Sequence, residues 1–303
     1  MIFEVSESIG TIIITVIVII LIIPIIPVIY FIIKKIKAAD ICLMISLGIS
    51  VFSIFALFLE KLCHLIIFSI FPKLKRTIWA YGLYGGFMAA LFEETGRLIT
   101  FYLIHNTPPL QKFSKNDLNS ILYGIGHGGF EIYILVTLTY VNNFKLYKMA
   151  ISGKLDKQYP KMKKNEVENY LNAIQSLNKL STTIMLYVII ERVIAFTFHI
   201  CSSVIIWIGV KFNKILKMYL IAFIIHFLSD ASIALVLEFK YESKVYSLFY
   251  IVIACFSLLS LILSIIFWMN YVDKQQDDEH LLTNIDDETN IIEINEINKT
   301  LFQ

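Results

Sequence analysis

The stretch GGFMAALFEETGRLITFYLI, residues 85–104, carries two adjacent glutamates and an arginine inside an otherwise apolar run. A charged side chain at the centre of a bilayer costs roughly 3 kcal/mol or more, so such residues are rare in membrane helices and usually serve a site. Glu93 and Glu94 precede Arg97 by four and three residues, so on one helix the arginine lies over both carboxylates. The stretch therefore predicts a membrane helix with a buried polar face, which other helices must cover.

The composition places the rest of the chain in the same class. The chain has 303 residues, of which 57% are hydrophobic, and a mean hydropathy of +0.73, with repeated apolar runs longer than the roughly 18 residues that a span requires. We expect an all-α, polytopic membrane helical bundle of about seven transmembrane helices, an integral multi-pass protein in contact with membrane lipid. A net charge of +2 gives no reason to expect a nucleic-acid partner.

The apolar segments predict where the spans lie. The first is expected to bend at Pro24 and Pro27, and the apolar piece 61–72 is too short to span and is expected to be interfacial or re-entrant. Residues 1–271 should form a single transmembrane helical domain, and residues 272–303 an acidic, mobile tail. The predicted spans are 9–33, 40–60, 77–104, 118–140, 181–209, 218–238 and 247–271.

The loop at 141–180 has apolar residues at helical spacing between charged ones, which fits a short interfacial helix or a solvated connector. Within the spans, Gly82 and Gly86 in the third and Gly124 and Gly128 in the fourth have the spacing that lets helices approach closely. We expect the third and fourth spans to be in close contact.

Away from the span ends, the ionisable side chains inside the predicted spans all fall in the third to sixth, so spans one, two and seven are expected to pack outside a polar cavity. Counted from one membrane face at 1.5 Å per residue, the catalytic candidates occupy a slab roughly 8 Å thick, about 12 to 20 Å deep. Glu191 and Arg192 lie deeper and are expected to form a supporting pair. The catalytic candidates are Glu93, Glu94, His127, Glu131, His199, His226 and Asp230, with Arg97 as a further supporting residue.

Four ordered strings carry a family resemblance: FEETGR from Phe92, GIGHGGFE from Gly124, ERVIAFTFH from Glu191, and HFLSD from His226. Together they resemble the YhfC family of intramembrane metalloproteases, which is similar to the CAAX-processing and bacteriocin-processing superfamily and to PrsW-type proteases. The resemblance covers the third to sixth predicted spans. It implies a helical membrane fold and peptide-bond hydrolysis, with a membrane-protein or peptide substrate.

The resemblance also implies roles for particular residues. Glu93 and Glu94 match the paired glutamates of the family and Arg97 the basic residue after them. Glu131 matches the position where CAAX proteases carry a histidine and PrsW-type proteases a glutamate. The remaining matches are His199 in the third motif, and His226 with Asp230 in the fourth. EExxR is one residue shorter than the EExxxR of CAAX proteases, and the final residue is an aspartate in place of asparagine, which favours YhfC over a prenyl-protein protease.

Two versions of the chemistry remain open. In the first, His199, His226 and a carboxylate, Glu131 or Asp230, hold a zinc ion, and Glu93 or Glu94 is the general base. In the second, no metal binds, a glutamate and a histidine activate water directly, and His226 with Asp230 polarises the scissile carbonyl. The chain lacks the HExxH spacing that would select the metal version.

Two other classes of protein compete with a protease. Ionisable side chains at mid-membrane also serve ion- or proton-coupled transporters, whose usual marks are interrupted helices and paired repeats. No proline interrupts the third to sixth spans, and no repeat is visible. A non-catalytic membrane scaffold is the third possibility, but it would tolerate loss of the acidic pair, and this chain keeps every motif residue.

Overall fold

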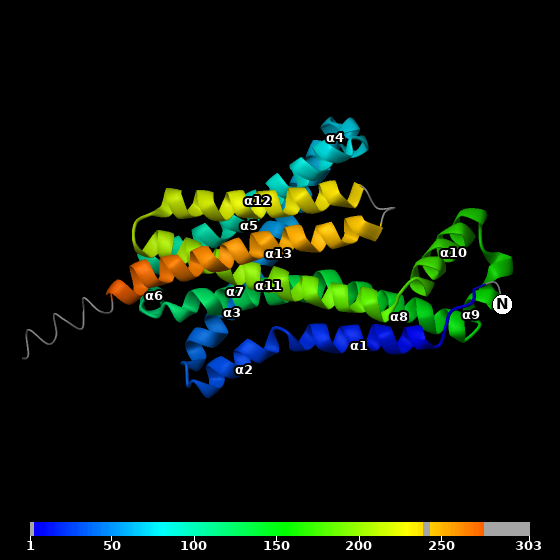
Figure 1. The fold of residues 1–303 in the computed structure, drawn as a ribbon, viewed down its shortest axis with the longest axis horizontal. Coiled ribbons are helices and arrows are strands. Elements are labelled where there is room, and N and C mark those ends of the chain that lie inside the picture. Colours follow the sequence, from blue (N-terminus) through cyan, green and yellow to red (C-terminus); the bar gives the residue numbers. More distant parts are fainter. Residues whose placement is uncertain (1–2, 239–242, 276–303) are drawn as a thin grey trace, which may run out of the picture.

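The computed structural model describes residues 3–238 and 243–275, and over these residues the protein is built from helices without a strand (Figure 1). Several long helices run side by side along the long axis of the molecule, and α4 and α10 project from the bundle. The elements are α1 Ser8–Ile22, α2 Ile25–Ile33, α3 Ala38–Phe52, η1 Ser53–Glu60, α4 Lys61–Ile70, η2 Pro72–Arg76, α5 Ile78–Asn106, α6 Gln111–Ser114, α7 Leu118–Ile132, η3 Tyr133–Thr137, α8 Leu138–Ile151, α9 Lys154–Gln158, η4 Tyr159–Lys161, α10 Lys164–Asn178, α11 Thr182–Lys211, α12 Ile215–Glu238, α13 Ser243–Phe267 and η5 Trp268–Asp273.

Long apolar helices make this an integral, multi-pass membrane protein whose outer helices contact lipid. The helix α5 is not in the set of clearly apolar spans, because its two glutamates and arginine make it less apolar, but its 29 residues, about 44 Å, exceed the roughly 30 Å core of a bilayer. The polytopic helical bundle is thus confirmed, whereas seven spans stays a prediction. The six helical stretches that are long and apolar enough to cross a membrane are Ser8–Ile33, Ala38–Ile70, Leu118–Ile151, Thr182–Lys211, Ile215–Ser232 and Tyr250–Asp273.

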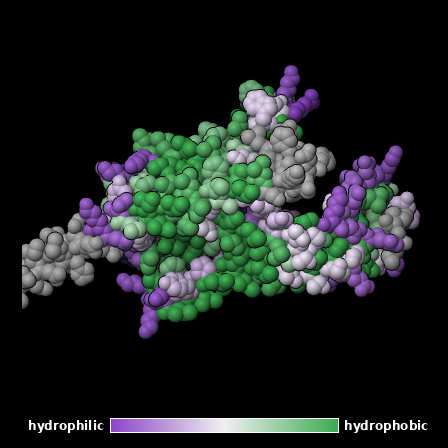
Figure 2. Space-filling model, in the orientation of Figure 1, coloured by the Kyte–Doolittle hydropathy of each residue, from purple (hydrophilic) through white to green (hydrophobic). Residues whose placement is uncertain are grey.

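The surface of the bundle agrees with this placement. Figure 2 shows a broad hydrophobic surface over the side of the bundle, with hydrophilic side chains gathered at its two ends and at the tip of α4. One of these two ends carries α9 and α10. The helix α10 contains the helical pattern predicted in the 141–180 loop, and its Ile174 and Leu177 are buried. The predicted tail lies, from residue 276 onward, outside the described residues.

The first span bends where the sequence predicts. The helix α1 ends at Ile22 and α2 begins at Ile25, with Pro24 between them. Proline interrupts the helix here because it removes a backbone donor and clashes with the preceding turn. Pro27 lies in the first turn of α2, so both predicted prolines lie at this one break.

The piece 61–72 is neither a separate interfacial helix nor a re-entrant loop, so that prediction is wrong. The helices α3, η1 and α4 form one continuous helix, Ala38–Ile70, of 33 residues, whose middle section η1 is a π-helix. No glycine or proline occurs from residue 53 to 71, so nothing in the sequence stops the helix before Pro72. Its last part, α4, extends beyond the neighbouring helices (Figure 1).

Glycines set the closest helix contacts, but not between the partners that the sequence predicts. A Cβ on Gly86 of α5 would lie 2.5 Å from the Ala231 nitrogen of α12, and one on Gly124 of α7 would lie 2.6 Å from the Ile200 Cα of α11. The third span therefore packs mainly against the sixth, and the fourth against the fifth and the second, so the prediction of a close α5–α7 backbone contact is wrong.

The second predicted span also packs closely, against α7. A Cβ on Gly48 of α3 would lie 2.6 Å from the His127 nitrogen, and one on Gly126 of α7 would lie 2.7 Å from the Ile45 Cα. The two backbones are therefore in van der Waals contact on both sides. This span is part of the wall that supports the polar cluster, contrary to the prediction that it packs outside.

Candidate active site

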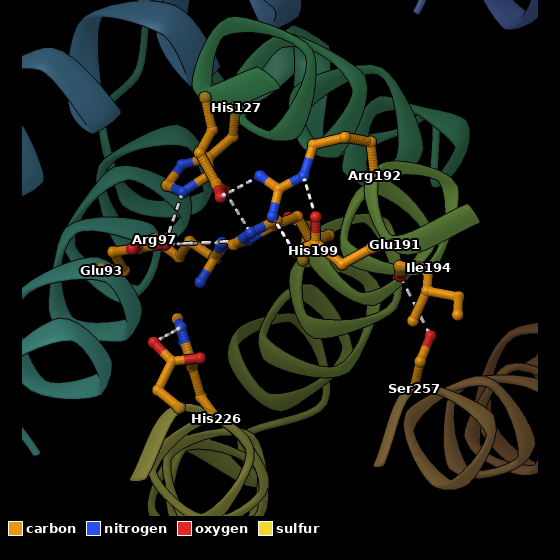
Figure 3. Close-up of polar contacts among 12 residues, drawn as sticks. Glu93, Arg97, His127, Glu191, Arg192, Ile194, His199, His226 and Ser257 are labelled. Atoms are coloured by element: carbon orange, nitrogen blue, oxygen red, sulfur yellow. Dashed lines mark hydrogen bonds and ion pairs between the residues drawn. The ribbon is translucent and has the colours of Figure 1, made fainter. Parts of the chain in front are cut away.

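Arg97 of α5 lies at the centre of the polar cluster and is fully buried. Its guanidinium donates to Glu94, to Glu93 Oε2 at 3.4 Å and to His199 Nδ1 at 2.6 Å (Figure 3). The predicted contact between Arg97 and a carboxylate is present, although the closer partner is Glu94 and not Glu93. Because a guanidinium can only donate, His199 Nδ1 carries no proton and accepts this hydrogen bond through its lone pair.

Glu93, His127 and His199 come together from α5, α7 and α11. The His127 Nε2 atom lies 2.9 Å from Glu93 Oε2, and His199 Nδ1 lies 3.6 Å from the same oxygen. One potential ligand atom from each of the three buried residues lies within 4.8 Å of the other two. Gly128 makes room for this, since a Cβ there would lie 3.1 Å from the His199 Cβ.

This trio is compatible with a metal ion. One carboxylate and two imidazoles form the kind of donor set that holds zinc in catalytic sites. The Nδ1 atom of His199 accepts from Arg97, so a metal ion at this nitrogen would take the place of that contact. The buried Nδ1 atom of His127 has no hydrogen-bond partner among the described residues, whereas its Nε2 atom faces Glu93.

Glu131, in the last turn of α7, contacts the other face of this trio. Its carboxylate accepts from His199 Nε2 and lies 3.6 Å from Arg192. Arg192 in turn donates two bonds to Glu191, so the predicted supporting pair of Glu191 and Arg192 forms and also reaches Glu131. A carboxylate on the second nitrogen of a metal-binding histidine fixes its tautomer and ring orientation.

His226 of α12 lies between two carboxylates. Its Nδ1 atom is 2.6 Å from Glu94 Oε1, and its Nε2 atom is 3.5 Å from Asp230 Oδ2. The rings of His226 and His199 are 5.8 Å apart, so the two histidines are neighbours. The predicted metal set of His199, His226 and Glu131 therefore differs from the set that the structure gathers, which shares only His199 with it.

A cavity of about 350 Å³ opens beside the cluster. Residues from α4, α5, α7, α11, α12 and α13 line it, and Ile253 and Ser257 of α13 form one wall. The prediction that the seventh span packs outside is thus wrong, because a charge-free helix can supply an apolar wall to a polar site. The predicted catalytic residues that face the cavity are Glu93, Glu131, His199, His226 and Asp230, whereas Glu94 and His127 lie behind them.

The sequence prediction missed a connected group of three residues, Glu60, His64 and Tyr84, at the α4 side of the cavity. His64 of α4 lines the cavity, its Nδ1 atom lies 2.8 Å from the Tyr84 hydroxyl, and its Nε2 atom lies 3.1 Å from Glu60 Oε1. Glu60 and His64 are four residues apart, the spacing that marks the other pairs, so this signal was available. It carries meaning only once residues 53–70 are recognised as one helix.

Comparisons with known proteins agree with this geometry. The chain matches a family model described as YhfC intramembrane metalloprotease over residues 19–256, which includes every residue of the cluster. A curated relative, an uncharacterized membrane protein YhfC from Bacillus subtilis (strain 168), is 28% identical over 113 residues. This alignment covers 35% of the chain and 40% of that relative. No solved structure matches.

Proposed function

This chain belongs to the YhfC intramembrane metalloprotease family, and from that premise we propose that it hydrolyses a peptide bond of a membrane-associated protein or peptide. The observation that carries the proposal is the gathering of Glu93, His127 and His199 within 4.8 Å beside a cavity that His226 and Asp230 also line. Such a cavity admits water to a mid-membrane site while helices keep lipid out, which hydrolysis within a bilayer requires.

The ion would be held by Glu93, His127 and His199, and zinc suits these donors. When bound, it supplies a nucleophilic water at neutral pH and polarises the scissile carbonyl. Glu131 holds the His199 ring through its Nε2 atom, and Arg97 balances the charge of Glu93 and Glu94. These contacts support a preformed site, because groups held by their neighbours need little reorganisation during the reaction.

His226 is our candidate for the proton-transferring residue. It lines the cavity, with Glu94 at its Nδ1 atom and Asp230 near its Nε2 atom. Hydrolysis requires one proton to leave the attacking water and one to reach the amine of the leaving group, and the Nε2 atom of His226 can carry out both transfers. Glu94, which is fully buried behind His226, then acts by orienting this ring and does not touch the substrate.

The test uses purified protein in liposomes with a library of single-span model peptides, and mass spectrometry to detect new chain ends. We expect wild-type cleavage, and a loss of roughly 10² to 10⁴ in rate for His226→Gln and for Glu93→Gln. His105→Gln removes a histidine from the far end of α5, where its ring packs on Trp207, and serves as the control that should leave cleavage unchanged.

Metal dependence is tested in the same preparation. We expect bound zinc in the wild-type protein, its loss in a His127→Ala/His199→Ala double variant, and cleavage that strong chelators abolish and added zinc restores. If the Glu93→Gln variant is inactive but cleavage by the wild-type protein resists chelators, the result would favour the metal-free version of the reaction, in which a glutamate and a histidine activate water directly. Unchanged cleavage in a Glu93→Gln/Glu94→Gln double variant would refute the assignment of cleavage to this cluster.

A further inference from the structure

The cavity extends along α5 from Tyr81 to Glu93, which corresponds to about 18 Å at 1.5 Å per residue. An extended peptide rises about 3.4 Å per residue, so about five residues would span this length.

Two adjacent glycines of α5 have different roles at this cavity. Gly86 packs against α12, and a Cβ there would lie 2.5 Å from the Ala231 nitrogen. Gly85 also lines the cavity, but a Cβ at Gly85 would meet no atom within 4 Å among the described residues. Helix packing therefore does not require a glycine at position 85. The absence of a side chain at position 85 leaves free space in the cavity.

The surroundings of Gly85 are aromatic. Tyr81 and Tyr84 line the same end of the cavity, and Phe68 of α4 packs on both rings at 5.9 and 5.4 Å. The hydrogen bond between Tyr84 and His64 holds this wall in position. Such walls favour a large apolar side chain through dispersion and aromatic contacts.

We propose that Gly85 is a specificity-determining residue, which gives room to a large apolar side chain of an extended substrate segment. The inference rests on the proposed protease function. Gly85 precedes Glu93 by about 12 Å along α5, which equals three to four residues of extended chain. The selected side chain therefore lies up to about four residues from the cleaved bond. The substrate class is a membrane-associated segment that carries a large apolar side chain near the cleaved bond.

The test is a size series at position 85 against paired substrates. Gly85→Ala, Gly85→Val and Gly85→Leu are assayed with model peptides that carry either Phe or Ala at one position, scanned through four residues on each side of the cut bond. At one position we expect Gly85→Leu to lower kcat/KM for the Phe peptide by roughly 10- to 200-fold and to leave the Ala peptide within about threefold. Equal effects on both peptides at every position, or no effect, would overturn the inference.

A second measurement needs no substrate. In protein whose native cysteines Cys42, Cys63, Cys201 and Cys255 are replaced by serine, the Gly85→Cys variant should react quickly with a water-soluble methanethiosulfonate reagent. The Ala90→Cys variant, at a fully buried position on the same helix, is the control and should react at least 100-fold more slowly. No reaction at position 85 would overturn the inference. Rapid reaction there, in a protein that cuts no peptide, would instead refute the proposed function.

Discussion

Replacing Arg97 by glutamine should destabilise the protein strongly, because it removes the cation that faces two buried carboxylates. Arg97 is fully buried and bonds Glu93, Glu94 and His199, so the variant leaves the two carboxylates without their main counter-charge. Removing one partner of a buried ion pair typically costs about 3 to 5 kcal/mol. At about 2 °C per kcal/mol for a chain of this length, the unfolding midpoint should fall by roughly 6 to 10 °C.

The assay is unfolding of the purified protein in mild detergent, followed by circular dichroism. Arg76→Gln makes the same chemical change at an exposed position of η2 and should stay within about 0.5 kcal/mol of wild type. The double variant Arg97→Gln/Glu94→Gln should regain about 1 to 3 kcal/mol relative to the sum of the single losses, because the charge left alone is removed with its partner. Strict additivity of the two losses, or an Arg97→Gln midpoint equal to wild type, would refute this reasoning.

Two further predictions concern packing and metal affinity. Gly86→Ala should lower the free energy of unfolding by about 1 to 3 kcal/mol, because its Cβ would press on the α12 backbone. Gly85→Ala should be neutral or stabilising, since alanine favours a helix by up to about 1 kcal/mol relative to glycine. Equal unfolding midpoints for the two variants would show that the contact between α5 and α12 is looser than described. Glu131→Gln should weaken zinc binding by roughly 10- to 100-fold through the His199 ring, measured by competition with a chromophoric chelator, and an unchanged Kd would show that Glu131 does not orient that ring.

The sequence allowed the heights of the polar residues to be predicted, but not their partners. Counting residues from one membrane face brings Glu94, Glu131, His199 and His226 to one depth, and in the structure each of them contacts another member of this group. Depth says nothing about the rotation of each helix about its own axis. That rotation turns Glu131 toward His199 and His226 toward Glu94, so the trio of potential metal ligands includes Glu93 and His127 in their place.

The glycines show a similar limit. The spacing of Gly124 and Gly128 correctly indicates a close helix contact, but one sequence does not say which helix approaches, and the partner is α11 and not α5. The path of residues 61–70 was missed for another reason. A prediction based on bilayer thickness ends a span after about 20 residues, whereas a helix continues until a residue stops it, and here this residue is Pro72.

The backbone contact between α3 and α7 changes how natural sequence variants of this protein should be read. A Cβ on Gly48 would collide with the backbone that carries His127, although Gly48 lies far in sequence from the four motifs. A survey that scores variants by their distance from the motifs would classify Gly48→Ala as harmless. The structure instead predicts that Gly48→Ala acts like a substitution of His127 itself, because the added Cβ would displace α7, the helix that carries this histidine.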